Sequence, residues 1–252
     1  MTTPSPSVAL AGAASCPETG RPHATGLSAY EHRLASRLLA GEGSLTMVAH
    51  RRTTPSSRVM PSSHATVLLH HLLPDGRLSV TCLESDVAHL TNGTVAVSIH
   101  RGALDDDLHV HFASVAVVGE LAWEPGTGGG TRTGSITPST VDLTWPGGSV
   151  SIDPSEIDTT VRACGAREAS QLVRDLGQEW VESLATSVRV GLAPGTVVSE
   201  LQLPPAAGMQ HRTWVADVDV EGVVVMCCSD TRLATVLVEL PTPACHAWLN
   251  RR

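Results

Sequence analysis

The chain has 252 residues, 42% hydrophobic and 17% charged, with 25 acidic residues against 17 basic ones and a formal net charge of −8. This length allows one large core or two small ones. The acidic balance disfavours nucleic acid as a partner, because phosphate binding depends on clustered basic side chains. Only 3% of the residues are aromatic, so a stacking platform for single-stranded nucleic acid is not expected either.

The N-terminal segment is rich in Pro, Ser, Thr, Ala and Gly and has no apolar period, so residues 1–27 are predicted to be a disordered tail. Its "VALAGAASC" is similar to a lipoprotein signal, but no basic residue precedes it, and Ala13 stands where such a signal has Leu. The cysteines are scattered without a CxxC pair, which is typical of reduced thiols in a cytoplasmic protein.

Ordered structure is expected to begin with a short helix. Ser28 and Glu31 have the spacing of a capping box, and Gly41 is placed to end the helix. One apolar stripe joins Leu34, Leu38 and Leu39.

Candidate strands follow at residues 44–50, 64–73, 77–83, 94–100 and 108–123. Pro74, Asp75 and Gly76 supply the turn chemistry of a hairpin between the second and third of them. The segment 125–134 has too much glycine for regular structure, and one more short strand is expected to end near Trp145. This pattern predicts a small β-barrel.

The second half opens with helical signals. Asp153 is expected to cap a helix that has Pro154 at its first position and ends at Gly165. A second helix is predicted from about residue 167 to 185. Its apolar face would comprise Ala169, Leu172, Val173, Leu176, Trp180 and Leu184.

Three strands are predicted to end the chain, at residues 213–220, 223–228 and 232–241. Two helices followed by a meander give an α+β pattern. We place a domain boundary near residue 148, which gives a tail at 1–27, a barrel domain at 28–148 and a small α+β domain at 149–252.

Ten of the twelve histidines lie between positions 23 and 111. On a strand, His109 and His111 would point to the same face, and two imidazoles at that spacing can share a metal ion. A cupin metal site would also need a carboxylate three or four residues later, where this chain has Val115 and Ala116. The stretch is therefore predicted to be a central barrel strand, and no metal site is assigned.

The other histidines of this region are expected on a neighbouring strand. Alternation places His70 and His71 on opposite faces and puts His64 on the same face as His70. These residues could cluster with His109 and His111 only if the two strands pair, which the sequence leaves open. Cys227 and Cys228 lie in an apolar strand, where packing is their expected role.

Two phrases carry a family resemblance: "VVGELAWEP" at 117–125, and the closing "DVEGVVVM" with "TRLATVLVELP". Together with the order of the elements, they resemble the HugZ-type haem oxygenase group. Such proteins join a split barrel, similar to the FMN-binding barrel of pyridoxamine 5'-phosphate oxidase, to a small α+β domain. The resemblance implies an α+β fold, with an N-terminal split β-barrel and a C-terminal helix-helix-meander domain, and a homodimer.

The resemblance also implies a haem ligand in the C-terminal segment, where His246 stands beside Cys245. Imidazole and thiolate both serve as axial ligands of haem iron. Many relatives carry a histidine and acid motif in the helices of the second domain. This chain departs from them, because it has no histidine between Asp153 and Gln210.

Three functions follow as expectations, and no catalytic residue is assigned. The first is haem binding through His246, for haem degradation or haem carriage. The second is a flavin- or deazaflavin-dependent oxidoreductase, in which Arg51, Arg52 and Arg58 hold the cofactor phosphate. The third is a catalytically silent split barrel that acts through contacts with a protein partner.

Overall fold

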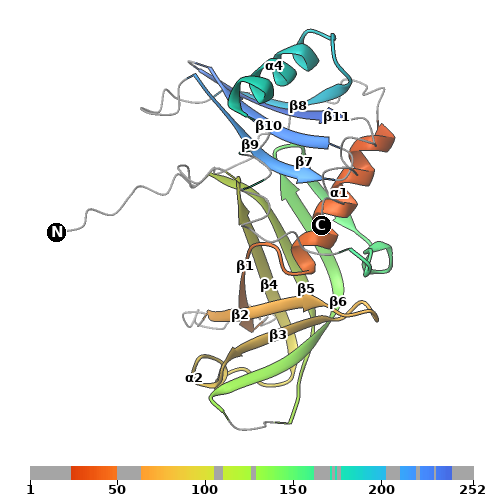
Figure 1. Ribbon diagram of the computed structural model, residues 1–252. Coiled ribbons are helices and arrows are strands. Elements are labelled where there is room, and N and C mark those ends of the chain that lie inside the picture. Colours follow the sequence, from red (N-terminus) through yellow and green to blue (C-terminus); the bar gives the residue numbers. More distant parts are fainter. Residues whose placement is uncertain are drawn as a thin grey trace, which may run out of the picture.

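A computed structural model describes residues 24–49, 64–104, 110–125, 129–161, 171, 174, 177–202, 211–219, 222–229 and 231–239. A β-barrel forms one half and a four-stranded antiparallel sheet the other (Figure 1). The described residues include no helix long and apolar enough to cross a membrane. The predicted barrel followed by a second strand-rich part is confirmed, but the described fold is mostly β with few helices, so the predicted α+β class overstates the helical content.

Six strands close the barrel in the order β3-β2-β1-β4-β5-β6, with β3 also paired to β6, and β7 extends the sheet beyond β6. Their bounds are β1 Ser44–Ala49, β2 Ala65–Leu72, β3 Leu78–Leu83, β4 Gly93–Gly102, β5 His111–Trp123, β6 Thr131–Trp145 and β7 Gly148–Ile152. All neighbouring strands are antiparallel. A short helix, α2 (Glu84–Val87), follows β3.

The strand that closes the barrel, β6, is longer than the sequence predicted. β6 begins at Thr131, inside the segment expected to be an irregular loop, and its first residues pair with β3 from Leu83 back to Leu78. Gly134 has no room for a side chain, since a Cβ there would lie 2.7 Å from the Trp123 ring. Gly134 therefore serves tight packing within a strand, while Gly129 and Gly130 before β6 have open space where a Cβ would lie. β7 was not predicted.

Helix α1 (Ala24–Leu39) lies at the junction of the two halves (Figure 1). It starts four residues before Ser28, so the predicted capping box is wrong and Ser28 lies within the helix. The predicted apolar stripe is confirmed, because Leu34, Leu38 and Leu39 are fully buried. The chain leaves the helix through Gly41, whose φ of 126° favours glycine.

The second half differs from its prediction in both helices. The predicted helix at Asp153 is a single 3-10 turn, η1 (Pro154–Glu156), because Ile157 returns to extended backbone. Helix α4 runs over Gln178–Arg189, later than expected, and buries Val181, Ala185 and Val188. The predicted apolar face is therefore wrong at Trp180, which is 41% exposed. Gly165, Ala169, Leu172, Val173 and Leu176 lie outside the described residues.

The second sheet has the order β8-β11-β10-β9. The predicted strands appear as β9 (Arg212–Asp219), β10 (Gly222–Cys228) and β11 (Arg232–Glu239), and β8 (Gly195–Gln202) was not predicted. One face of this sheet packs on α4 through valines, and the other joins the core of α1 and the barrel. Burial on both faces explains why β10 reads as a continuous apolar run. The boundary predicted near residue 148 stays a prediction.

A β-bulge in β2 changes which residues face the barrel interior. The register with β3 shifts between Val67 and Leu69, so both Leu68 and Leu69 are exposed and His70 is buried. His64 is exposed, so the prediction that it shares a face with His70 is wrong, because it assumed uninterrupted alternation. His70 and His71 do point to opposite sides, as predicted.

Candidate functional site

Five side chains from α1, β4, β9 and the turn after α1 form a buried ionic group, which we call the junction cluster: Tyr30, Arg37, Glu42, Arg101 and Asp217. Asp217 is fully buried and accepts a hydrogen bond of 2.6 Å from Tyr30 Oη. Arg37 pairs with both of its oxygens, and Arg101 Nη2 lies 2.8 Å from Oδ1. Arg101 Nη1 also lies 2.7 Å from Glu42 Oε2.

The junction cluster is electrostatically matched. Burial by itself raises the pKa of Asp217, but the charges of Arg37 and Arg101 and the hydrogen bonds from Arg37 and Tyr30 outweigh it and lower the pKa to about 2. The carboxylate is therefore ionised at neutral pH. Each charge has an opposite charge within the cluster, so the group joins α1, the barrel and the second sheet.

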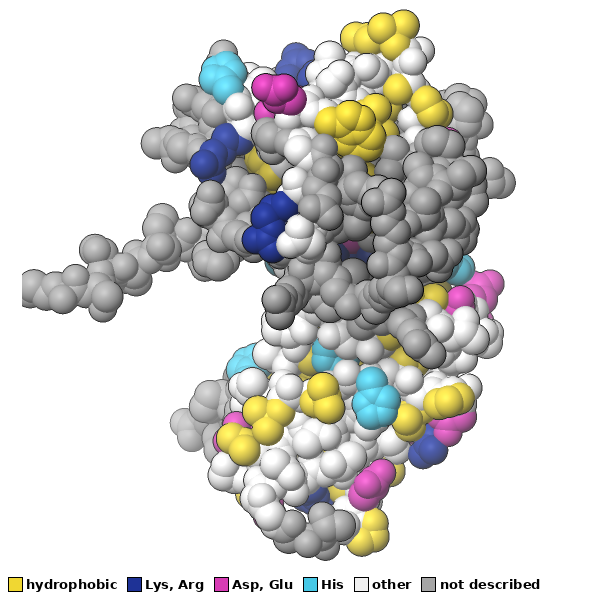
Figure 2. Space-filling view, viewed as in Figure 1, with side chains coloured by type: hydrophobic (Ala, Val, Ile, Leu, Met, Phe, Trp, Pro, Cys, Tyr) yellow, Lys and Arg dark blue, Asp and Glu magenta, His cyan; other side chains and the backbone are white. Residues whose placement is uncertain are grey.

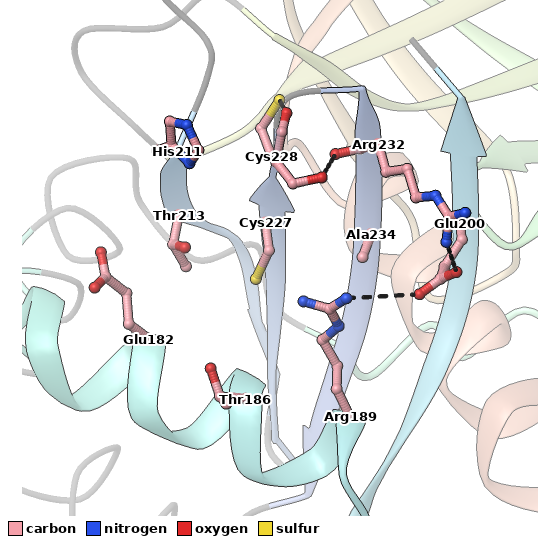
Figure 3. Close-up of a pocket in the computed structure, with 11 residues that line it drawn as sticks. Glu182, Thr186, Arg189, Glu200, His211, Thr213, Cys227, Cys228, Arg232 and Ala234 are labelled. Atoms are coloured by element: carbon pink, nitrogen blue, oxygen red, sulfur yellow. Dashed lines mark hydrogen bonds and ion pairs between the residues drawn. The ribbon is translucent and has the colours of Figure 1, made fainter.

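A different polar group lines a pocket of about 270 Å³ at one end of the second sheet, between the sheet and α4 (Figure 3). Its floor is one row across the sheet, in which Cys227 is paired with Thr213 on β9 and with Ala234 on β11. One face of α4 forms the wall, through Glu182, Thr186 and Arg189. His211, Cys228, Ser229, Arg232 and Glu200 complete this lining, which we call the sheet pocket.

Charges in the sheet pocket are unevenly placed. Arg189 Nη2 and Arg232 Nη1 each lie 3.8 Å from a different oxygen of Glu200, and Figure 3 shows Glu182 at the opposite side. The three grouped side chains carry a net charge of +1 and are 44–61% exposed. A separation of 3.8 Å is too long for a hydrogen bond, so these ion pairs leave guanidinium donors able to bind another anion.

Cys227 lies in the floor of the sheet pocket as a thiol. Burial raises its pKa, and this outweighs the lowering by the Thr213 hydrogen bond and by the charge of Arg189. A raised pKa disfavours the nucleophilic thiolate. His211 stands at the rim with a φ of 56°, a left-handed conformation that is uncommon outside glycine. In Figure 2, histidine, acidic and basic side chains gather at the upper left, around the end of the sheet where β9 begins.

The residues that the sequence predicted as cofactor ligands stay predictions. Arg51, Arg52, Arg58, Cys245 and His246 lie outside the described residues. His109 does too, and His111 contacts His100 on the neighbouring strand. β2 and β5 are not paired, so the His64, His70 and His111 part of the suggested cluster does not form. Among the described residues, no group of three His, Cys, Asp or Glu side chains could hold a metal ion.

Sequence reasoning missed the sheet pocket because its residues come from five separate elements. One signal was available: Glu182, Thr186 and Arg189 follow each other at helical spacing, as a polar stripe beside the buried face of α4. Glu200 could not be placed, because β8 was not recognised as a strand. The pairing of Cys227 with Thr213 depends on long-range register.

Comparisons with known proteins add a distant likeness of fold. No family model matches the chain, and no curated protein matches it. Among solved structures, it is similar to the protein Atu2129 of Agrobacterium tumefaciens strain C58, described as of unknown function. The two share 12% identity with a TM-score of 0.35, over 92% of this chain and 97% of the other.

Proposed function

We propose that this protein binds a small anionic molecule, carrying a carboxylate or a phosphate group, in the sheet pocket. The observation that carries the proposal is the placement of Arg189 and Arg232 on either side of Glu200, at distances that leave their donors unsaturated. Guanidinium forks bind carboxylate and phosphate with paired, charge-assisted hydrogen bonds. The hydroxyl of Thr186 adds a neutral group to the wall of the same pocket.

The size of the sheet pocket sets the class of ligand. Pockets for drug-sized molecules occupy about 300–1,000 Å³, and this one measures about 270 Å³. A compact carboxylic acid or phosphate ester fits this volume. Glu182, on the side opposite the arginines, would favour a ligand with a hydroxyl or ammonium group at its other end.

Calorimetric titration of the full-length protein with inorganic phosphate, succinate and citrate tests the proposal. Saturable binding of one equivalent of at least one probe is expected. Arg189→Gln and Arg232→Gln should each weaken it at least tenfold, while Arg77→Gln should leave it unchanged. Arg77 is a matched control, because it is 46% exposed and also pairs with a carboxylate, that of Asp75. Failure of all three probes to bind, or equal affinities in all variants, would contradict the proposal.

Haem binding through His246 is a second proposal, favoured by where the resembling phrases lie. "VVGELAWEP" runs along barrel strand β5, and the closing phrase covers most of β10 and all of β11. The test is an absorption spectrum of the purified protein before and after adding haem, then FMN. A haem band that is lost in His246→Ala supports the proposal. A full haem band in that variant would show that His246 is not the iron ligand. A flavin spectrum would favour the alternative, in which Arg51, Arg52 and Arg58 bind the cofactor phosphate.

We also propose that the protein is a homodimer. The alternative of a catalytically silent barrel that acts by protein contact is kept as a proposal too. The bulge in β2 favours them, because it leaves Leu68 and Leu69 54% and 62% exposed next to each other on the outer barrel surface. Sedimentation of the full chain should show a dimer that dissociates in Leu68→Asp/Leu69→Asp. A wild-type monomer would reject the homodimer.

A further inference from the structure

A pair of histidines on the outer surface of the barrel has no part in the proposed function. His100 on β4 and His111 at the start of β5 are both exposed, and their rings meet edge to face at a centroid separation of 5.4 Å and an angle of 88°. Nδ1 of His100 lies 3.3 Å from Nε2 of His111. The register of the two strands shifts between Arg101 and Gly102, and this irregularity lies directly between the two histidines.

The two nitrogens lie about as far apart as two imidazole ligands of one transition-metal ion. Imidazole nitrogens bind Zn²⁺ at about 2.0–2.1 Å, so two of them are about 3.3–3.4 Å apart at the tetrahedral angle of Zn²⁺. At the right angle of a tetragonal Cu²⁺ or Ni²⁺ site they are about 2.8–3.0 Å apart, so the two nitrogens would move closer by about 0.5 Å. Both side chains are exposed, so small rotations of the rings can bring the nitrogens to either arrangement. Partial burial and the neighbouring His100 both lower the pKa of His111, which favours the neutral imidazole that coordinates metals.

We propose that His100 and His111 form a two-histidine binding site for a divalent transition-metal ion of the Zn²⁺, Ni²⁺ or Cu²⁺ type. Neutral imidazoles suit these ions in preference to Mg²⁺ or Ca²⁺, which take oxygen ligands. The two imidazoles occupy two coordination positions, and water or an external ligand fills the others. Cu²⁺ should bind most tightly, following the general order of affinities for nitrogen sites.

Titration of the full-length, untagged protein with CuCl₂, followed by calorimetry and electron paramagnetic resonance, tests this site. One equivalent should bind ahead of any weaker sites, with a spectrum showing coupling to two nitrogens. His100→Ala and His111→Ala should each weaken this first equivalent at least tenfold. His71→Ala is the matched control, because it removes an exposed barrel histidine from another strand, and it should bind Cu²⁺ as the wild type does.

The inference is overturned if either His100→Ala or His111→Ala keeps the first equivalent, or if His71→Ala loses it to the same extent. It is also overturned if the wild-type spectrum shows only one coupled nitrogen. Melting curves without metal verify folding, and all three variants should match the wild type because the side chains are exposed. The outcome is independent of the sheet pocket, which shares no residue with this pair.

Discussion

The junction cluster and the sheet pocket contain the same kinds of charged side chain and use them differently. In the junction cluster, Arg101 lies 2.7–2.8 Å from two carboxylates, and all the charged side chains are no more than 8% exposed. In the sheet pocket, Arg189 and Arg232 lie 3.8 Å from one shared carboxylate, and all three side chains are at least 44% exposed. Burial and distance separate the two groups, and residue type does not.

On the proposed function, this difference separates charges that stabilise the fold from charges that can bind a ligand. A buried ion pair that loses one partner leaves an uncompensated charge, so substitutions in the junction cluster should strongly destabilise the fold. An exposed pair contributes little to stability, about 0–1 kcal/mol, because water solvates and screens it. The loosely paired arginines of the sheet pocket can therefore exchange partners, which a binding site requires.

Breaking the junction cluster should have the largest effect. Asp217→Asn removes the carboxylate that contacts Tyr30, Arg37 and Arg101 together, and we expect a loss of about 3–5 kcal/mol in the free energy of unfolding. Urea denaturation measures it. Asp75→Asn, which breaks the exposed pair with Arg77, is the control and should change the free energy of unfolding far less, because water solvates and screens this pair. Equal losses in the free energy of unfolding for the two substitutions would contradict the distinction between buried and exposed charge pairs.

Acid should weaken the same cluster. The pKa of Asp217 is lowered to about 2 in the folded protein, against about 3.9 in an unfolded chain. Its contribution is therefore fully present above pH 4 and is lost as the pH falls from about 4 to 2, amounting to about 2–3 kcal/mol. Urea denaturation at several pH values in this range should show that the free energy of unfolding falls with pH in the wild type and falls less steeply in Asp217→Asn. An equally steep fall in both proteins would mean that Asp217 is not the group responsible.

His70 should give a smaller effect at higher pH. Burial lowers its pKa and outweighs the opposing hydrogen bond to Leu38 O, at 2.9 Å from Nε2. A lowered histidine pKa means that the unfolded chain binds the proton more tightly, so stability should fall as the pH drops through about 6.5. Melting temperatures from pH 8 to 5 should show this decline in the wild type and not in His70→Gln. The control is His71→Gln, whose side chain is exposed, and it should keep the decline.

The elements that sequence predicted correctly have local signals, and those it missed depend on tertiary contacts. Leu34, Leu38 and Leu39 define α1 by periodicity, and the hairpin at Pro74–Gly76 follows from turn chemistry. The start of β6 was missed because the glycine-rich sequence is typical of a loop, whereas Gly134 lies within the strand and packs closely beside Trp123. The bulge in β2 has no local sequence signal. The sequence therefore could not predict that His64 is exposed while His70 is buried.

The resemblance phrase also shows how packing and function can be confused. In "VVGELAWEP", Gly119 has no room for a side chain, because a Cβ would lie 2.4 Å from Thr137 O where the register of β5 and β6 shifts. Trp123 donates a hydrogen bond to Leu90 O and stacks under Arg132. Packing within the barrel thus explains Gly119 and Trp123, two residues of the phrase. The polar residues of the sheet pocket carry no comparable motif.

The most direct test of the division between the two groups is one set of melting curves. Arg189→Gln/Arg232→Gln should melt within about 2–4 °C of the wild type, the shift expected for about 1 kcal/mol in a chain of this size. Of phosphate, succinate and citrate, the probe that binds most tightly in the calorimetric titration should raise the melting temperature of the wild type and of Arg77→Gln by more than that of the double variant, because only the first two bind it in the sheet pocket. A large loss of stability in the double variant, or equal shifts of all three proteins with that probe, would contradict the account.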